Sequence, residues 1–364
     1  MKPSTIRRWA PRLKRAIFHV GARTGATGVI RNSPWRGRRL LILGYHGVAL
    51  ADEASWNPGL FIPVELLAAR CEYLRKSGFQ ILPLEPALGM LAEGRLPQRS
   101  AVITFDDGFY NFHAQARPLL EVYGFASTVY LSTYYCGKRL PVFDPLCFYL
   151  LWKGRERRID LGGLVPEGGV LEAGVGAVER DRQAARVVAF AKAHLDAQEK
   201  HHLARAIATR AHVDFDEIVA RRLFDLLSPE EVKQCAASSA PTSIELHTHT
   251  HAMPMERSRF LTEVETNRAH IMRILGRPEP PRHLCFPSGV FEACHLTWMR
   301  ETGIHSGVTC EPGLASARDN PLCLPRFIDM ACFSAHWFDA VASGLADWLP
   351  KRSRIASGGY QRMR

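Results

Sequence analysis

The amino-acid sequence predicts an α/β fold, a distorted (β/α) barrel of 7–8 parallel strands with a helical insertion. Two observations indicate this fold: short apolar runs alternate with helix-like stretches along most of the chain, and four of the runs end in polar clusters. Repeated strand–helix–strand order is typical of a parallel sheet with helices outside it. Because the carboxyl ends of barrel strands meet at one edge, we expect the polar clusters to share a pocket.

Eight apolar runs are the candidate strands. They cover residues 40–45, 79–82, 101–105, 126–131, 242–246, 283–286, 305–309 and 323–328. Between the first two runs, Val64, Leu67, Cys71 and Leu74 recur at helical spacing, and Gly78 is a helix stop signal. Residues 112–123 and 257–275 have the same helix-like pattern, so helices are expected there too.

The segment from about 144 to 240 interrupts this alternation. It contains no strand that the barrel needs, and its stretches 178–209 and 216–236 are charged and helix-like. We expect a helical insertion between consecutive strands, and a small subdomain fits the pattern equally well. The predicted organisation is therefore a basic N-terminal segment (1–39), a barrel (40–345) and a basic C-terminal tail (346–364).

The net charge of +11 lies largely near the two ends of the chain. Such charge suggests an anionic partner: a phospholipid headgroup, a nucleic acid or an acidic glycan. No recognised nucleic-acid-binding motif is present, so a nucleic-acid partner is not expected. Apolar residues recur at helical spacing from Ile6 to Val20 with basic residues between them. This pattern is typical of a helix lying on a membrane surface, and a helix packed on the domain would have the same pattern.

The nine cysteines favour a reducing compartment, because their number is odd, no CxxC pair occurs and several lie in apolar runs. The basic leader has no uninterrupted apolar segment behind it, and no run of 18 apolar residues occurs. We therefore expect a cytoplasmic protein, with peripheral contact to the inner membrane through its leader. The sequence does not indicate an oligomeric state.

Four strand ends carry the residues that are candidates for chemistry. These are His46-Gly47, Asp106-Asp107-Gly108, the HTHTH run 247–251 and Pro287-Ser288-Gly289. Successive side chains of a strand alternate in direction, so one aspartate of the pair can bind a cation while the other accepts a proton. A plain Asp-Gly turn is the alternative interpretation of the pair.

The HTHTH run predicts a metal site. His247 and His251 suit one divalent ion if the chain turns helically after the strand, whereas His247, His249 and His251 share a face if the strand continues. Two histidines and one aspartate leave coordination positions open for water, which is typical of a catalytic site.

Four segments together resemble the polysaccharide deacetylase family, which contains the NodB-homology domain and forms carbohydrate esterase family 4. They are LILGYHGV at 41–48, TFDDG at 104–108, HTHTH at 247–251 and LCFPSG at 284–289. The first is similar to the branch whose barrel begins with a Y-H-x-V strand. The resemblance covers roughly residues 40–140 and 242–330, and its H-T-x-x-H motif selects the His247 and His251 pair.

The resemblance implies metal-dependent hydrolysis of the N-acetyl amide of an N-acetylated sugar, with release of acetate. The implied ligands are Asp107, His247 and His251, and the implied ion is Zn²⁺, with Co²⁺, Mn²⁺ or Ni²⁺ as alternatives. Asp106 is the implied general base. A backbone N–H of the 287–289 turn, that of Ser288, is expected to bind the oxyanion.

The sequence motifs indicate the general acid, and the arginine that orients Asp106, less directly. The Y-H-x-V branch takes its acid from the first strand, which implies His46, and His336 in FSAHW is the alternative. Many members carry an arginine that orients the base, but Cys285 stands at the equivalent loop of this sequence. Arg282 and the segment Arg326–Asp329 are the candidates to replace that arginine.

The substrate class follows from the expected compartment. In the cytoplasm, a soluble glycoside or a sugar on a lipid carrier fits better than finished wall polymer. A catalytically inactive glycan-binding protein with the same barrel is the alternative to an enzyme.

Overall fold

The computed structural model describes residues 17–21, 23–166 and 168–349. Most of the leader helix expected from Ile6 to Val20, and the C-terminal tail from residue 350, lie outside this range. No helix within the described residues is long and apolar enough to cross a membrane.

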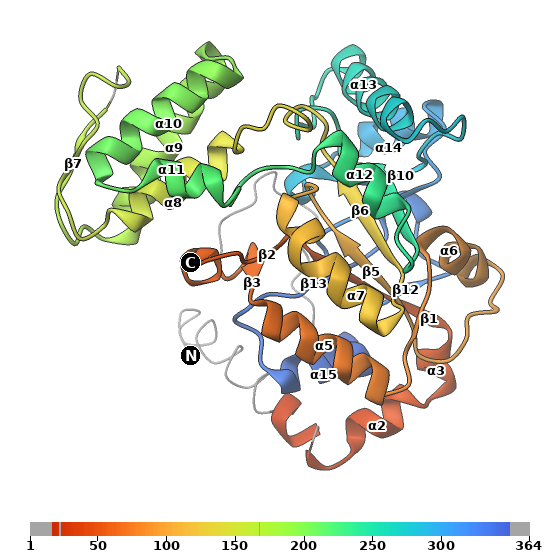
Figure 1. Ribbon diagram of the computed structural model, residues 1–364. Coiled ribbons are helices and arrows are strands. Elements are labelled where there is room, and N and C mark those ends of the chain that lie inside the picture. The colour runs from red at the N-terminus through yellow and green to blue at the C-terminus, as the bar shows by residue number, and fades with distance from the viewer. Residues whose placement is uncertain (1–16, 22, 167, 350–364) are drawn as a thin grey trace, which may run out of the picture.

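A curled nine-stranded sheet forms the centre of the molecule (Figure 1). Its main path runs β11-β10-β9-β6-β5-β1-β12, with β4 paired to β5 and β13 paired to β1. The strands are β1 (Arg39–Tyr45), β4 (Gln80–Ile81), β5 (Ser100–Phe105), β6 (Ser127–Leu131), β9 (Thr242–Leu246), β10 (His283–Cys285), β11 (Ser306–Val308), β12 (Ala315–Ser316) and β13 (Phe327–Ile328). Only the pairing of β12 with β1 is antiparallel, so the predicted parallel sheet is confirmed.

The sheet curls until its two sides meet. Beyond the main path, β13 pairs in parallel with β1, and a parallel bridge between Val308 and Leu324 brings the chain before β13 beside β11. The predicted distorted barrel is confirmed. Strand β13 is shorter than the predicted 323–328, because residues 321–323 form a 3₁₀ turn and Pro325 has no N–H for a strand pairing.

The strands form where both faces can be buried. All six residues of β5 are buried, and so are six of the seven residues of β1. In β1, Leu41 and Leu43 belong to the largest apolar cluster, while Leu40 and Ile42 belong to another cluster on the opposite face. Such continuous apolar runs are expected of a parallel sheet that is covered on both sides.

Helices cover the outside of the barrel. They are α2 (Ala26–Arg31), α3 (Pro34–Gly37), α5 (Val64–Lys76), α6 (Leu84–Ala92), α7 (Arg117–Tyr123), α12 (Pro229–Ala236), α13 (Arg257–Leu275), α14 (Ala293–Glu301) and α15 (Ala335–Ser343). The helix expected at 112–123 begins instead as a π-helical turn over Phe112–Ala116. Pro118, in the first turn of α7, has no N–H with which to extend the regular α-helical hydrogen bonding backward.

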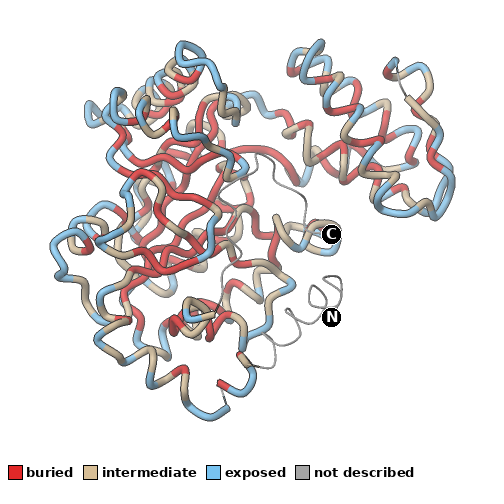
Figure 2. Tube along the Cα trace, turned by 180° about the vertical axis from the view of Figure 1, so that it is seen from behind, coloured by how far each residue is buried: buried red, intermediate tan, exposed pale blue. Residues whose placement is uncertain are grey.

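The chain between β6 and β9 builds a separate lobe of helices (Figure 1). The lobe contains α8 (Phe143–Lys153), α9 (Ala177–His194), α10 (Ala197–Ala211), α11 (Phe215–Ala220) and a small hairpin of β7 (Ile159–Asp160) and β8 (Val170–Leu171). It has an apolar core of its own, visible as the buried stretches at the upper right of Figure 2. Helix α12, within the segment expected to be an insertion, packs on the barrel against α13 and β9 instead.

The lobe is joined to the barrel beside the strand ends. Its apolar core includes Phe61 and Phe109 of the barrel loops. Phe61 belongs to the short parallel pair of β2 (Gly47–Val48) and β3 (Phe61–Ile62), and α4 (Glu53–Trp56) lies between these two strands in the chain. Phe109 forms an antiparallel bridge with Leu226, where the chain leaves the lobe.

Candidate active site

The carboxyl ends of β5 and β9 bring together the three residues expected to bind a metal. Asp107 Oδ1 lies 3.1 Å from Nε2 of His247 and 3.2 Å from Nε2 of His251. One ligand atom from each residue lies within 4.8 Å of the others. A carboxylate oxygen and two imidazole nitrogens this close together match the donor set of a three-ligand zinc site.

His247 is held in the orientation that a metal ligand needs. Its Nδ1 lies 2.8 Å from the carbonyl oxygen of Cys285, which can accept a hydrogen bond from Nδ1–H, and its Nε2 faces Asp107. The residue is buried, with 1% of its surface exposed. The carbonyl of the last residue of β10 therefore fixes the orientation of the His247 ring.

We expected a helical turn after β9 to bring His247 and His251 together. The chain forms no such turn, so this expectation is wrong. It bends through two residues in the left-handed region, Thr248 (φ 61°) and His251 (φ 58°), and this bend returns His251 to His247. His249 points away, because its Nδ1 lies 2.9 Å from Thr133 Oγ1 and its ring stacks on His270.

The electrostatics of this cluster favour a charged carboxylate. Burial raises the pKa of Asp107, but the hydrogen bonds from His247 and His251 outweigh it and leave that pKa well below its usual value. Burial lowers the pKa of His251, and the contact with Asp107 raises it by more. An anionic site with two imidazole donors is the environment that a divalent cation would occupy in place of protons.

A tight glycine turn sets the direction of the aspartates. Asp107 has φ 67° and Gly108 has φ 81°. A Cβ atom on Gly108 would come within 2.3 Å of Leu131 Cδ1, so a larger residue would displace Leu131 and would also be strained by the positive φ. The turn leaves the two carboxylates on different sides, as the alternation of strand side chains predicts.

Asp106 is bound by an arginine. Arg326 donates two parallel hydrogen bonds to it, Nη1 to Oδ1 at 2.6 Å and Nη2 to Oδ2 at 2.7 Å. The guanidinium is fully buried, and Nη2 also lies 3.2 Å from Cys285 Sγ. Of the two arginines that the sequence offered, Arg282 is exposed and Arg326 orients Asp106.

The pKa of Asp106 reflects this pairing. Burial raises the pKa, but the charge and hydrogen bonds of Arg326 outweigh burial, and the pKa ends below its usual value. Asp106 is therefore ionised at neutral pH and able to accept a proton.

The two candidates for the general acid lie in different surroundings. His46 follows β1, and its Nε2 lies 3.7 Å from Asp106 Oδ2. Burial lowers the pKa of His46, and the nearby Asp106 and Asp107 offset this only in part, so the ring is neutral at pH 7. His336 is exposed on α15, where its ring lies 4.7 Å from that of His19.

The remaining predicted site residue, Ser288, lies in the 3₁₀ turn Pro287–Gly289 that follows β10. It has φ 56° and an exposed side chain. The turn begins two residues after Cys285, whose carbonyl oxygen lies 2.8 Å from Nδ1 of His247. The turn is therefore close in the chain to a residue that contacts one of the predicted metal ligands.

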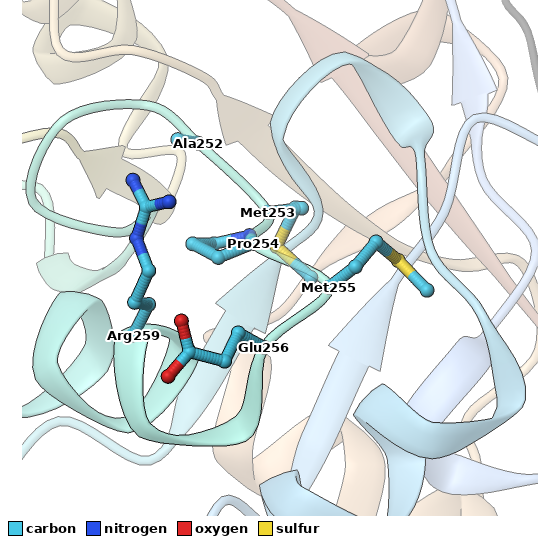
Figure 3. A pocket seen from close by; sticks show the side chains of 6 residues that line it. All are labelled: Ala252, Met253, Pro254, Met255, Glu256 and Arg259. Carbon is cyan, nitrogen blue, oxygen red and sulfur yellow. The ribbon is translucent and has the colours of Figure 1, made fainter.

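A shallow hollow of about 540 Å³ is formed by the segment that follows His251 in the chain (Figure 3). It begins at Ala252, the residue after His251. Its walls are the apolar side chains of Met253, Pro254 and Met255 and the charged groups of Glu256 and Arg259. Met255 is 63% exposed. The hollow offers an apolar surface and two opposite charges.

Sequence reasoning missed the residues of α13 that contact the HTHTH loop. Asn267 is fully buried and accepts a hydrogen bond from the backbone N–H of His247 at 3.0 Å. The available signal was its position: Asn267 falls in the apolar stripe of Phe260, Val264 and Ile271. A polar residue at a core position of an amphipathic helix needs a buried partner.

Comparisons with known proteins identify relatives in one class. A segment covering 26% of the chain is 31% identical to YxkH of Bacillus subtilis, whose name assigns it provisionally to the polysaccharide deacetylases. A segment covering 26% of the chain is 25% identical to the poly-β-1,6-N-acetyl-D-glucosamine N-deacetylase of Escherichia coli. These segments span 32% and 14% of the two relatives. No protein-family model matches the chain.

The fold has counterparts among solved structures. The deacetylase PplD of Streptococcus pyogenes, solved with acetate, has a TM-score of 0.53 to this chain. The superposition covers 85% of this chain and 97% of PplD, at 17% sequence identity. The likeness extends over almost the whole of PplD and supports the deacetylase barrel as the fold.

Proposed function

Because its sequence relatives and structural neighbours are polysaccharide deacetylases, we propose that this chain is a carbohydrate N-deacetylase of the NodB-homology family. It hydrolyses the N-acetyl amide of an N-acetylated sugar and releases acetate. The observation that carries this proposal is the cluster of Asp107, His247 and His251 beside the arginine-bound Asp106. Three metal ligands alone could bind a cation without catalysis. The ionised carboxylate of Asp106 beside them adds the proton acceptor that hydrolysis needs.

Asp107, His247 and His251 would hold the cation, and Zn²⁺ is the ion that their donor set suits best. Co²⁺, Mn²⁺ and Ni²⁺ are alternatives. A bound divalent cation supplies Lewis acidity, which polarises the acetamide and makes water more acidic. The fit is supported by the His247 ring, whose Nδ1–H is already committed to Cys285 and leaves Nε2 as the ligand atom.

The residues around the cluster would move the protons. Asp106 accepts a proton from the attacking water, and the resulting oxygen nucleophile adds to the acetamide carbon. The neutral His46, 3.7 Å from Asp106, can receive this proton and donate it to the leaving amine as the C–N bond breaks. The backbone N–H of Ser288 would stabilise the negative charge on the carbonyl oxygen.

Acetate release tests the proposal. We would load the protein with Zn²⁺, Co²⁺, Mn²⁺ or Ni²⁺ and assay acetate release from N-acetylglucosamine oligomers and from lipid-linked N-acetyl sugars. The expected result is metal-dependent release from at least one of these classes. Stoichiometric metal binding with no acetate from any N-acetyl substrate would contradict the proposal, and glycan binding without turnover would indicate a catalytically inactive relative.

Arg326→Lys is expected to lower kcat, roughly 10–100-fold by analogy with the loss of a partner that orients a metal ligand. Lysine keeps the charge but not the two parallel hydrogen bonds to Asp106. Weaker pairing raises the pKa of Asp106, so the acid limb of the pH–kcat profile should move to higher pH. Arg282→Lys, at an exposed position, is the control. An unchanged acid limb would show that Arg326 does not tune the base.

We also propose a cytoplasmic location on the inner face of the membrane. All nine cysteines are free thiols, which suits a reducing compartment. Residues 1–16 hold six Lys or Arg and residues 350–364 hold five, with no acidic residue in either segment. Subtracting these 11 from the 47 basic residues leaves 36, equal to the 36 acidic ones. The whole net charge therefore lies in the two terminal segments, which favours an anionic lipid surface.

Vesicle binding checks the membrane proposal. The protein is expected to co-sediment with phosphatidylglycerol vesicles and to be released at high salt, since exposed charges are screened. It should not co-sediment with phosphatidylcholine vesicles. Replacing Arg7, Arg8, Arg12 and Arg15 with Gln should weaken binding, at roughly 1 kcal/mol for each residue near the surface. Equal binding to neutral vesicles, or tighter binding to DNA, would contradict the proposal.

A further inference from the structure

The loop that carries the two histidines is strained. Between β9 and His251 the backbone passes through Thr248 at φ 61° and ends at His251 at φ 58°. Neither residue is glycine, so both occupy a sparsely populated region that persists only when neighbouring groups hold it. The position of His251 therefore depends on the groups that stabilise this loop.

Helix α13 supplies those groups. Glu263 accepts two hydrogen bonds from Thr250, one from the backbone N–H to Oε2 and one from the hydroxyl to Oε1, both at 2.7 Å. The backbone N–H of His249 donates to the carbonyl oxygen of Glu263 at 3.2 Å. One helical turn later, Asn267 accepts from the N–H of His247 and donates to the carbonyl of Leu131 at 2.9 Å.

The two histidines differ in how much other support they have. His247 is buried, and its ring is fixed by the carbonyl of Cys285. The side chain of His251 is 41% exposed, and within the cluster it contacts Asp107 and, at 4.9 Å between ring centroids, His247. The position of His251 thus depends more on the backbone of the loop, and Thr250, its neighbour, is where Glu263 holds that backbone.

We propose that Glu263 is a positioning residue for the metal site, which sets His251 through the two hydrogen bonds to Thr250. The inference rests on the proposed metal site, but not on the identity of the substrate. Glu263 touches neither the cluster nor a reacting atom. It fixes the strained bend so that His251 faces Asp107 before a metal arrives, and this preorganisation lowers the cost of binding.

The metal affinity of the 364-residue chain tests this role. For Glu263→Ala, Zn²⁺ affinity measured by competition with a chromophoric chelator should fall roughly 10–100-fold, the range for outer partners of metal ligands. The visible spectrum of the Co²⁺ protein should change, because His251 no longer holds its place. Glu263→Gln should restore affinity to within about threefold, since its amide can accept from the N–H of Thr250 and donate to the hydroxyl.

Glu265→Ala is the matched control. Glu265 lies on the same helix, is exposed and pairs with Arg268. It should leave Zn²⁺ affinity unchanged. Thr250→Ala removes only the hydroxyl partner and should cause a smaller loss than Glu263→Ala. This variant tests the same hydrogen bonds without altering the helix.

Two results would overturn the inference. One is a Glu263→Ala protein that binds Zn²⁺ as tightly as Glu265→Ala. The other is an equal loss in Glu263→Ala and Glu263→Gln, which would assign the effect to the carboxylate charge. Both readouts are independent of acetate release, so a failure of the deacetylase proposal would be seen separately.

Discussion

Replacing Asp106 with Asn is expected to abolish acetate release while the metal remains bound. The amide has nearly the shape of the carboxylate but cannot accept the proton of the attacking water. General-base catalysis typically contributes about 10²–10⁴-fold, so kcat should fall by at least that range. Asp106 is not one of the three clustered ligands, and Zn²⁺ affinity should therefore stay within about twofold of the wild type.

The same substitution has a predictable cost in stability. Arg326 is fully buried and would lose the charge that it pairs with. Breaking one side of a buried pair typically costs about 3–5 kcal/mol, so the melting temperature should drop. Activity must therefore be compared below the melting temperature of the variant, and metal content must be measured in the same sample. Turnover above a tenth of the wild-type value would exclude Asp106 as the base.

Replacing His247 with Ala is expected to remove both metal and activity. His247 is the most firmly held ligand of the cluster, with Nδ1 bound to the Cys285 carbonyl and Nε2 3.1 Å from Asp107. Losing a direct ligand should weaken Zn²⁺ binding more than the roughly 10–100-fold expected for an outer partner. Metal analysis after dialysis should find the variant empty, and acetate release should fall to background.

His249 provides the matched control for this variant. It lies two residues away in the same run, but it stacks on His270 outside the cluster. His249→Ala should therefore retain the metal and most of the activity. If both variants lost metal equally, the effect would be general damage to the loop, and the assignment of His247 as a ligand would fail.

The barrel was predictable because its signals are local. Each predicted strand is a short apolar run, and every one overlaps a strand of the sheet. The helix expected at 257–275 has those same bounds, because apolar spacing marks its length and Gly276 ends it in a left-handed conformation. Where proline intervened, at Pro118 and Pro325, the elements changed their geometry or shortened.

The candidate site was predictable only in part. Strand-end position and motif spacing indicated the aspartates and histidines, and the structure brings Asp107, His247 and His251 together. Strand-end position and motif spacing could not show whether Arg282 or Arg326 is the partner of Asp106, because the answer depends on which strands lie near each other in the barrel. Glu263 was missed for a similar reason: its contact with Thr250 is tertiary, and an acidic residue on a half-exposed helix face is common.

The junction between lobe and barrel has a consequence for how the molecule folds. The segment after Asp107 forms backbone hydrogen bonds with the chain leaving the lobe, Leu227 N–H to Gly108 O at 2.9 Å and Tyr110 N–H to Asp225 O at 2.8 Å. Phe109 is part of the lobe's apolar core. Opening the lobe would therefore loosen the turn that presents both aspartates. We therefore expect the lobe and the loop that carries both aspartates to unfold as one cooperative unit. The stability of the aspartate turn would then depend on a region that supplies none of the predicted catalytic or metal-binding residues.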